Sequence, residues 1–456
     1  MGVTGLGGSM LLFPCLVCFP MVTFAIVLIF GHELPLGRSL PTCWLDRICI
    51  HQTDMDKKKE QINALPVFVA QSSKMLVLWD QTYFERLWCN LELATCARYG
   101  GTDKVELMPL WLAPWLLSTI LLDLSSAGIL EIMVHLFPNY SAAWMHDIPE
   151  MSESIFGHNP VMESFVSSFD VWMFSGISYL PVSIPSFFCF RAKFLSHQLM
   201  LEQMSTFDVR AAHCTVASDR ASIEEQVTAL FSGMEDKTAA PLPSAVDDGE
   251  VVLQRFEPLQ EDPLVRFNAF IRGNLREFVI SQIGDELSVP YHICLVAFLP
   301  MIFYSSVNVL GCDNGPCASS AKLAGYRSVS EYMITQIVGW VLVFVLAFPL
   351  TYPLLLRMIN CVLSFGDGPL QLLLAFLCCP LAYMYIYVCG GICWGAWLTL
   401  VKEPSPIQLL VFLLVLAALI MQLLWLFQYP SRRRAESCRC VKRQTYEALA
   451  HVQSGK

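Results

Sequence analysis

Two short phrases decide how this chain folds, CWLDRICIHQ at Cys43–Gln52 and RLWCNLELA at Arg86–Ala94. The apolar residues of Trp44–Ile50, with one inward acid among them, predict a buried strand, and Lys74–Trp79 predicts a second one. A helical pattern separates the two strands, and another runs from about Thr82 to Tyr99. Strands that alternate with helices of this length favour a parallel α/β sheet in which the two predicted strands are neighbours. The functional groups of such a sheet lie at the carboxyl ends of its strands.

The same phrases resemble those of two known families. Residues Trp44–Gln52 (WLDRICIHQ) are similar to a phrase of fungal heterokaryon-incompatibility domains. Residues Trp88–Leu93 (WCNLEL) resemble the WCxxEL phrase of Toll/interleukin-1 receptor (TIR) domains. Both phrases occur together in a large group of dinoflagellate multi-pass membrane proteins, which this chain resembles. The resemblance covers roughly Pro41 to Trp115, about a sixth of the chain.

The resemblance to TIR domains that hydrolyse NAD implies a site. It makes Glu92 the catalytic residue, with Asp46 and Trp88 lining the pocket and NAD as the substrate. A carboxylate suits this reaction because breaking the nicotinamide–ribose bond builds positive charge on the sugar. An apolar segment takes the place of the family's first strand, so we expect a truncated domain, which favours a non-catalytic module that self-associates. The alternative interpretation makes Glu92 an ordinary helix residue and Asp46 a structural acid that caps a loop.

Composition indicates a membrane protein. The 456 residues are 55% hydrophobic and only 15% charged, with a mean hydropathy of +0.52, whereas soluble domains carry about 25% charged residues. The net charge of −10 offers no basic face, so we expect no nucleic acid among the partners. The 18 cysteines show no paired CxxC spacing, so we expect no metal site. No Walker, dinucleotide-binding or zinc-protease phrase suggests another class of enzyme.

Long apolar runs predict a multi-pass helical protein whose first partner is the lipid bilayer. Residues 292–429 form the expected transmembrane region. Its four spans lie at about 292–310, 334–356, 370–400 and 409–429. The N-terminal segment, residues 1–40, contains the apolar run Met10–Phe30, which is long enough for a further span.

Two other apolar segments, Leu107–Leu122 and Val171–Phe190, are marginal. Asp123 and Glu131 interrupt the run that continues from the first segment. An acid at the centre of a span costs about 2.5–3.5 kcal/mol on insertion. The second segment contains two prolines and four serines. We therefore expect both segments to stay outside the lipid core.

Basic residues predict the orientation. The tail, residues 430–456, is rich in arginine and lysine, and the positive-inside rule places it in the cytoplasm. An even number of spans then places residues 31–291 in the cytoplasm as well. The loop between the first two strong spans would face an oxidising compartment, where Cys312 and Cys317 would form a disulfide. The alternative is a pair of free thiols.

Cys438 and Cys440 lie in the basic tail beside the last span. This position makes them candidates for lipidation by palmitate, and they can equally be unmodified.

The region between the α/β unit and the transmembrane region, residues 116–291, is expected to be mostly helical, with a flexible linker at 235–249. Residues Ser222–Glu225 match a capping box that opens one helix. Asp262 followed by proline predicts the start of another, whose apolar stripe runs from Leu264 to Val279. This second helix either lies on the membrane surface or packs on the soluble domain.

These features predict a membrane-anchored TIR-like signalling or assembly module. An NAD hydrolase that uses Glu92 is its enzymatic version. Another hypothesis is a transporter or channel subunit that its cytoplasmic domain regulates, although the four strong spans carry no buried acid or base that would mark an ion path. The remaining alternative is a helical bundle that anchors and oligomerises a degenerate soluble domain.

Overall fold

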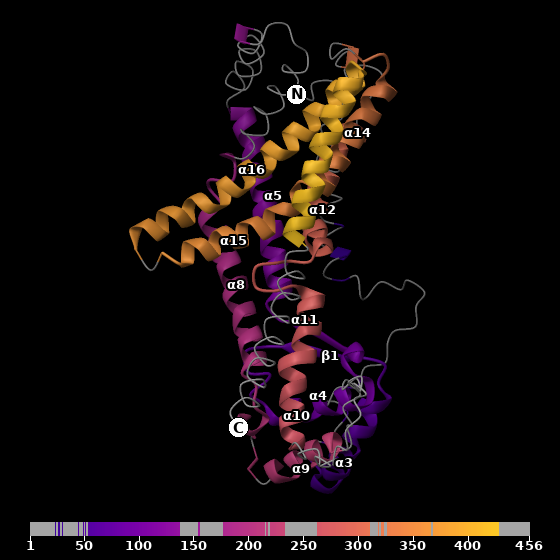
Figure 1. Ribbon diagram of the computed structural model, residues 1–456, viewed down its shortest axis with the longest axis vertical. Helices are drawn as coiled ribbons and strands as arrows, with labels where there is room; N and C mark the ends of the chain where they lie inside the picture. The colour runs from indigo at the N-terminus through magenta and orange to yellow at the C-terminus, as the bar shows by residue number, and fades with distance from the viewer. Residues whose placement is uncertain are drawn as a thin grey trace, which may run out of the picture. The chain divides into compact units, whose positions relative to one another are not determined.

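The computed structural model describes residues 53–136, 177–214, 219–232, 262–310, 326–365 and 368–427, together with a few isolated positions such as Trp44. The chain divides into two compact units. Unit 1 comprises Met1–Leu36, Ala113–Leu195 and Gly284–Lys456, and unit 2 comprises Gly37–Leu112 and Ser196–Ile283. The described residues are mostly helical, and Figure 1 labels the longer helices and strand β1.

The sheet of unit 2 has two described strands, β1 (Met75–Trp79) and β2 (Val105–Pro109). They are parallel and pair in register from Met75 with Val105 to Trp79 with Pro109. Helix α4 (Leu87–Gly100) and the short helix η2 (Thr102–Lys104) connect them. The second predicted strand and the helix after it are therefore confirmed, and the described sheet is parallel, but the parallel partner of β1 is Val105–Pro109.

The predicted strand over Trp44–Ile50 lies mostly outside the described residues. Of its two described positions, Trp44 has no regular structure and Cys49 is helical, so neither confirms a strand beside β1. The Trp44 ring instead stacks on Phe68 of helix α3 (Met55–Gln71), with ring centroids 6.0 Å apart. Trp44 therefore packs on a helix. The sequence pattern alone did not distinguish an apolar residue that packs on a helix from one that packs within a sheet. A complete TIR-like sheet is not among the described elements.

Local sequence explains where the helices of unit 2 begin and end. Asp54 caps α3, because its carboxylate accepts hydrogen bonds from the backbone N–H groups of Asp56 and Lys57 at 3.1 and 3.2 Å. Helix α4 ends at Gly101, whose φ of 65° favours glycine. Inside α4 the buried Asn90 donates to the carbonyl oxygen of Phe84 at 3.0 Å.

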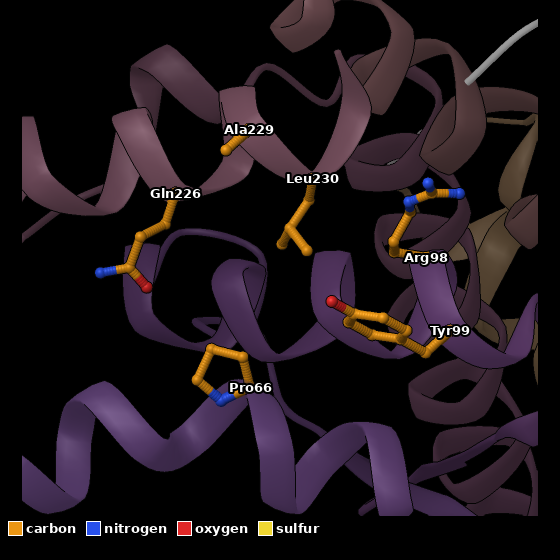
Figure 2. Close-up of a pocket in the computed structure, with 6 residues that line it drawn as sticks. All are labelled: Pro66, Arg98, Tyr99, Gln226, Ala229 and Leu230. Atoms are coloured by element: carbon orange, nitrogen blue, oxygen red, sulfur yellow. The ribbon is translucent and has the colours of Figure 1, made fainter. Parts of the chain in front are cut away.

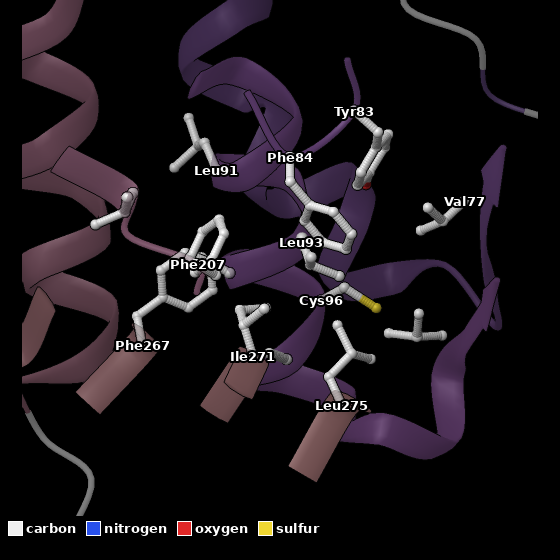
Figure 3. Close-up of a cluster of buried hydrophobic side chains, with 14 of the residues drawn as sticks. Val77, Tyr83, Phe84, Leu91, Leu93, Cys96, Phe207, Phe267, Ile271 and Leu275 are labelled. Carbon is white, nitrogen blue, oxygen red and sulfur yellow. The ribbon is translucent and has the colours of Figure 1, made fainter. Parts of the chain in front are cut away.

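The apolar stripe that begins at Leu264 belongs to the core of unit 2. It runs through helix α10 (Pro263–Phe270), the π-helical segment η4 (Ile271–Leu275) and helix α11 (Arg276–Ile283). Every fourth residue along it is fully buried: Phe267, Ile271, Leu275 and Val279. Figure 3 shows three of these side chains beside Leu91, Leu93 and Phe207. Of the two alternatives for this helix, the structure shows packing in the core of unit 2.

Two predicted helix starts have different outcomes. The Asp262 cap is confirmed, because its side chain accepts a hydrogen bond from the N–H of Leu264 at 2.9 Å. The capping box at Ser222 is wrong. Helix α9 (Asp219–Phe231) already begins at Asp219, so Ser222 lies within the helix, where its hydroxyl is 3.4 Å from Nε2 of Gln226.

Unit 1 contains most of the long apolar helices. Their bounds are α5 (Leu112–Leu136), α8 (Ser183–Ser205), α12 (Tyr291–Leu310), α14 (Val329–Leu346), α15 (Thr351–Leu363), α16 (Pro369–Lys402) and a last helix at Pro406–Phe427. The first residue of α5 and the last ten of α8 fall in unit 2. Helix α16 packs against both α14 and α15 (Figure 1).

Four helical stretches of the described residues are long and apolar enough to cross a membrane. Three of them, Val329–Leu363, Pro369–Lys402 and Pro406–Phe427, match predicted spans. The predicted span at 292–310 is the helix α12, of which Tyr291–Ile302 forms a shorter apolar helix. By length and composition, these stretches are consistent with a location in a membrane.

The fourth stretch, Leu112–Leu130 in α5, is the one that differs from expectation. We expected the apolar run around Asp123 to stay outside the lipid, because an unpartnered acid would oppose insertion. The side chain of Asp123 is only 1% exposed, and its partners are described below.

Several predicted features lie outside the described residues. They are Asp46, the cysteine pairs Cys312 with Cys317 and Cys438 with Cys440, the linker at 235–249, the tail at 430–456 and most of Met10–Phe30.

Candidate functional sites

The expected catalytic residue, Glu92, lies on α4 between two core residues. Leu91 and Leu93 are each 1% exposed, whereas Glu92 and Trp88 are half-buried. Trp88 packs against the core of unit 2. Because Asp46 is outside the described residues, the structure places two of the three expected pocket residues on one helix and leaves the third unplaced.

A buried hydroxyl accompanies Glu92. Burial, with Cys89 and Glu92 nearby, raises the pKa of Tyr83 well above its ordinary value. The Tyr83 hydroxyl has no hydrogen-bond partner among the described residues. Tyr83 also lies under Arg86, whose guanidinium carbon is 5.8 Å from the ring centroid. This arrangement keeps Tyr83 protonated, as a potential hydrogen-bond donor near the carboxylate.

A hollow of about 320 Å³ opens elsewhere on unit 2. Its lining comes from α3, α4 and α9 and consists of Pro66, Arg98, Tyr99, Gln226, Ala229 and Leu230 (Figure 2). Figure 2 shows Leu230 and the Tyr99 ring facing the space between these helices. Neither Glu92 nor Trp88 lines this hollow. The predicted catalytic residue Glu92 and the pocket-lining residue Trp88 therefore lie at a different place on unit 2 from the described hollow.

Unit 1 contains a cluster that the sequence did not predict. Asp123 on α5 accepts a hydrogen bond from the Tyr352 hydroxyl of α15 at 2.9 Å. Its other carboxylate oxygen accepts one from the Tyr383 hydroxyl of α16. The Tyr179 ring stacks on Tyr383, with centroids 3.5 Å apart. One turn along α5, Ser126 shares a hydrogen bond of 2.8 Å with Ser178.

The Asp123 cluster has a clear physical basis. A buried carboxyl in apolar surroundings is costly unless it is hydrogen-bonded, and a buried tyrosine needs a partner for its hydroxyl. Each oxygen of Asp123 satisfies one tyrosine, so three helices are joined at one point. Aromatic packing holds Tyr352 in place, because its ring centroid lies 5.1 to 5.6 Å from those of Phe298, Phe190 and Trp115. Tyrosines in the middle of the apolar runs were the signal that could have revealed these partners.

A buried lysine in α8 is hydrogen-bonded to the loop that precedes α12. Lys193 is 2% exposed, and its Nζ donates hydrogen bonds to the carbonyl oxygens of Glu286 and Ser288 at 3.1 and 2.9 Å. Burial lowers the pKa of Lys193 to about 7, against the opposing effect of Asp285 and Glu286. The role that its surroundings indicate is structural.

Within the described residues, no group of three histidine, cysteine, aspartate or glutamate side chains is placed to hold a metal ion. Comparisons with protein-family models, with curated proteins and with solved structures found no match to this chain. The resemblance carried by the two phrases therefore stays a prediction, and the function is argued from the residues alone.

Proposed function

We propose that the protein is a membrane-anchored assembly module, in which unit 1 holds the chain in the bilayer and unit 2 self-associates. The observation that carries the proposal is the hollow between α3, α4 and α9, with Arg98 and Tyr99 on its wall. Arginine and tyrosine are enriched among the residues that contribute most to protein–protein binding. Tyr99 is 56% exposed, so a large part of its ring is available to a partner.

The surface around the hollow favours a second copy of the chain as that partner. Val67 follows the lining residue Pro66 on α3 and is 55% exposed. Unit 2 thus offers a hollow with polar and apolar side chains on its wall, and an exposed apolar side chain next in sequence to one of the lining residues. A two-fold axis can place the projection of each copy in the hollow of the other, and two-fold dimers are the commonest homo-oligomers.

Replacing Tyr99 with alanine is the test. The full chain in nanodiscs should form dimers, and Tyr99→Ala should weaken them by at least about 30-fold, because truncating a hot-spot residue costs about 2 kcal/mol or more. Mass photometry over a range of protein-to-disc ratios measures the change. Val216→Ala is the matched control, since Val216 is 49% exposed in unit 2 and does not line the hollow. A monomeric wild type, or a Tyr99→Ala protein that dimerises equally well, would reject the proposal.

NAD hydrolysis is the enzymatic form of this proposal and depends on Glu92. The observation in its favour is the half-buried carboxylate near the protonated Tyr83 hydroxyl. Purified protein should consume NAD, and Glu92→Ala should abolish that activity because the developing positive charge loses its carboxylate. Glu85→Ala is the control, since Glu85 is an exposed glutamate of the same segment. Equal activity in Glu92→Ala would end the catalytic hypothesis without affecting self-association.

Transport is a second candidate function, and Asp123 is the observation that favours it. An acidic side chain within a membrane-spanning helix commonly marks an ion or proton pathway. Purified protein reconstituted into liposomes provides the test. Proton or ion flux across those liposomes would support transport. No flux under an imposed gradient would reject it.

A further inference from the structure

The two faces of the β1–β2 sheet differ in what covers them. Val77, Trp79, Val105 and Leu107 point into the core and are 1 to 4% exposed. On the opposite face, exposure rises to between 43 and 54% at Leu76, Leu78, Met108 and Leu110, the residue that follows β2. We call these last four residues the apolar sheet face.

An apolar face of this kind calls for a cover. Parallel sheets occur almost always with both faces packed against other elements. Register pairs Leu78 directly with Met108, and the N–H of Leu110 extends the pairing by donating to the carbonyl oxygen of Trp79 at 3.0 Å. Leu78, Met108 and Leu110 therefore lie on adjacent, hydrogen-bonded segments. Leu76 continues the patch along β1, where its partner in the register is Glu106.

The apolar sheet face is close in the chain to a candidate membrane span. Strand β2 ends at Pro109, and α5, which carries the candidate span Leu112–Leu130, begins at Leu112. Only two residues intervene, and an extended chain covers at most about 3.6 Å per residue. The end of β2 therefore lies within about 11 Å of the first residue of the span. That reach is comparable to the depth of the polar headgroup layer, about 5–7 Å on each side of a bilayer.

Polarity along the sheet agrees with this placement. Near the start of the strands, beside Leu76, Lys74 and Glu106 form an exposed ion pair with a nitrogen–oxygen distance of 3.0 Å. The end that leads to α5 is apolar at Leu78, Met108 and Leu110. Elements that lie at a lipid–water boundary combine an apolar part that enters the lipid with a charged part that faces water.

The nearest charged group at the apolar end is satisfied within unit 2. Asp80 follows β1, and its carboxylate accepts hydrogen bonds from the N–H and hydroxyl of Thr82, both at 2.9 Å. Arg86 lies 3.6 Å from the same carboxylate oxygen. The Asp80 carboxylate is therefore hydrogen-bonded and ion-paired within unit 2 and needs no partner from the lipid.

We propose that the apolar sheet face rests in the boundary between headgroups and acyl chains of the bilayer that α5 enters, with lipid as its cover. The inference goes beyond self-association through the hollow, which uses different residues of unit 2. It rests on α5 as a membrane span. A second copy of the chain, or another segment of the same chain, is the alternative cover.

Site-specific photocrosslinking in the full chain tests the proposal. Benzoylphenylalanine is introduced at Leu78, at Met108 or, as control, at Val216, whose exposure of 49% matches the 48% of Leu78. The proteins are placed in phosphatidylcholine nanodiscs, irradiated and analysed by mass spectrometry. We expect phospholipid adducts at positions 78 and 108 in several-fold excess over position 216. Equal melting temperatures of the three proteins confirm that the substitutions leave the fold intact.

Other results overturn the proposal. Crosslinks from 78 and 108 to peptides of the same chain, or to a second copy, would identify a protein cover. If no adduct forms, hydroxyl-radical footprinting of the wild type decides. Oxidation of Leu78 and Met108 as fast as that of Val216, after each rate is divided by the intrinsic reactivity of its residue type, would show a face open to water. Protection without lipid contact would again indicate protein. The oligomeric state measured on the same samples reports separately on self-association.

Discussion

Replacing Asp123 with alanine is expected to destabilise unit 1 by about 1–3.5 kcal/mol. The substitution removes both hydrogen bonds that Tyr352 and Tyr383 donate to the carboxylate. Interhelical hydrogen bonds in membrane proteins contribute about 0.6 kcal/mol on average and at most about 1.7 kcal/mol, because the unfolded chain in the membrane also finds partners. The larger values known from soluble cores therefore do not apply. Unfolding by denaturing detergent, followed by circular dichroism, measures the change.

A double-mutant cycle isolates the contribution of the hydrogen bonds. Tyr383→Phe removes one hydroxyl, and in the double variant with Asp123→Ala that loss should cost little more, since the acceptor is already absent. Ser125→Ala is the matched control on α5, because Ser125 is exposed and bonds only the carbonyl oxygen of Leu121 in its own helix. Strictly additive losses for Asp123→Ala and Tyr383→Phe would show that the two residues act independently and would contradict the cluster.

The largest expected loss of stability follows from Phe267→Ala in α10, at about 3–5 kcal/mol. The Phe267 side chain is fully buried. Its ring centroid lies 5.6 Å from that of Phe207 and 5.2 Å from that of Phe231, so three segments of unit 2 meet on it. Truncation leaves a cavity that well-packed neighbours fill only in part. Hydrogen exchange of the α10 amides in the full chain should show the corresponding increase in opening.

Val265→Ala provides the comparison on the same helix. Val265 is 40% exposed, so its truncation should change exchange rates very little. The pair of variants also distinguishes the two interpretations of this helix that the sequence left open. If the stripe faced lipid rather than the core of unit 2, Phe267→Ala would leave unit 2 almost unchanged.

Local patterns were sufficient for the parts of the fold that depend on neighbouring residues. The period of the stripe from Leu264 predicted which face of α10 and α11 is buried, and Asp262 with its proline marked the first turn. Lys74–Trp79 was recognised as a strand because an apolar run of strand length follows a helix. Ser222 shows the limit of such rules, since it satisfies a helix-start pattern one turn inside a helix that begins at Asp219.

The Asp123 cluster could not be predicted in the same way because its members are far apart in the sequence. Tyr352 is 229 residues and Tyr383 is 260 residues from Asp123. Considered without its partners, Asp123 argued against a membrane span in α5, because an unpaired acid at the centre of a span carries the full free-energy cost of insertion. Its partners lie in two other candidate membrane spans, Val329–Leu363 and Pro369–Lys402, and only the tertiary structure shows that they share one acceptor.

The π-helical segment Ile271–Leu275 has a geometric consequence for the long stripe. Buried residues there recur every four positions, from Phe267 through Ile271 and Leu275 to Val279. In a regular α-helix of 3.6 residues per turn, each step of four rotates the side chain about 40° past the previous one. Three such steps would swing Val279 about 120° around the axis from Phe267. The π-helical turn at η4 has hydrogen bonds spaced one residue further apart and so contains more residues per turn. It therefore reduces the angle by which each step of four residues overshoots a full turn, and residues spaced four apart can face the same core.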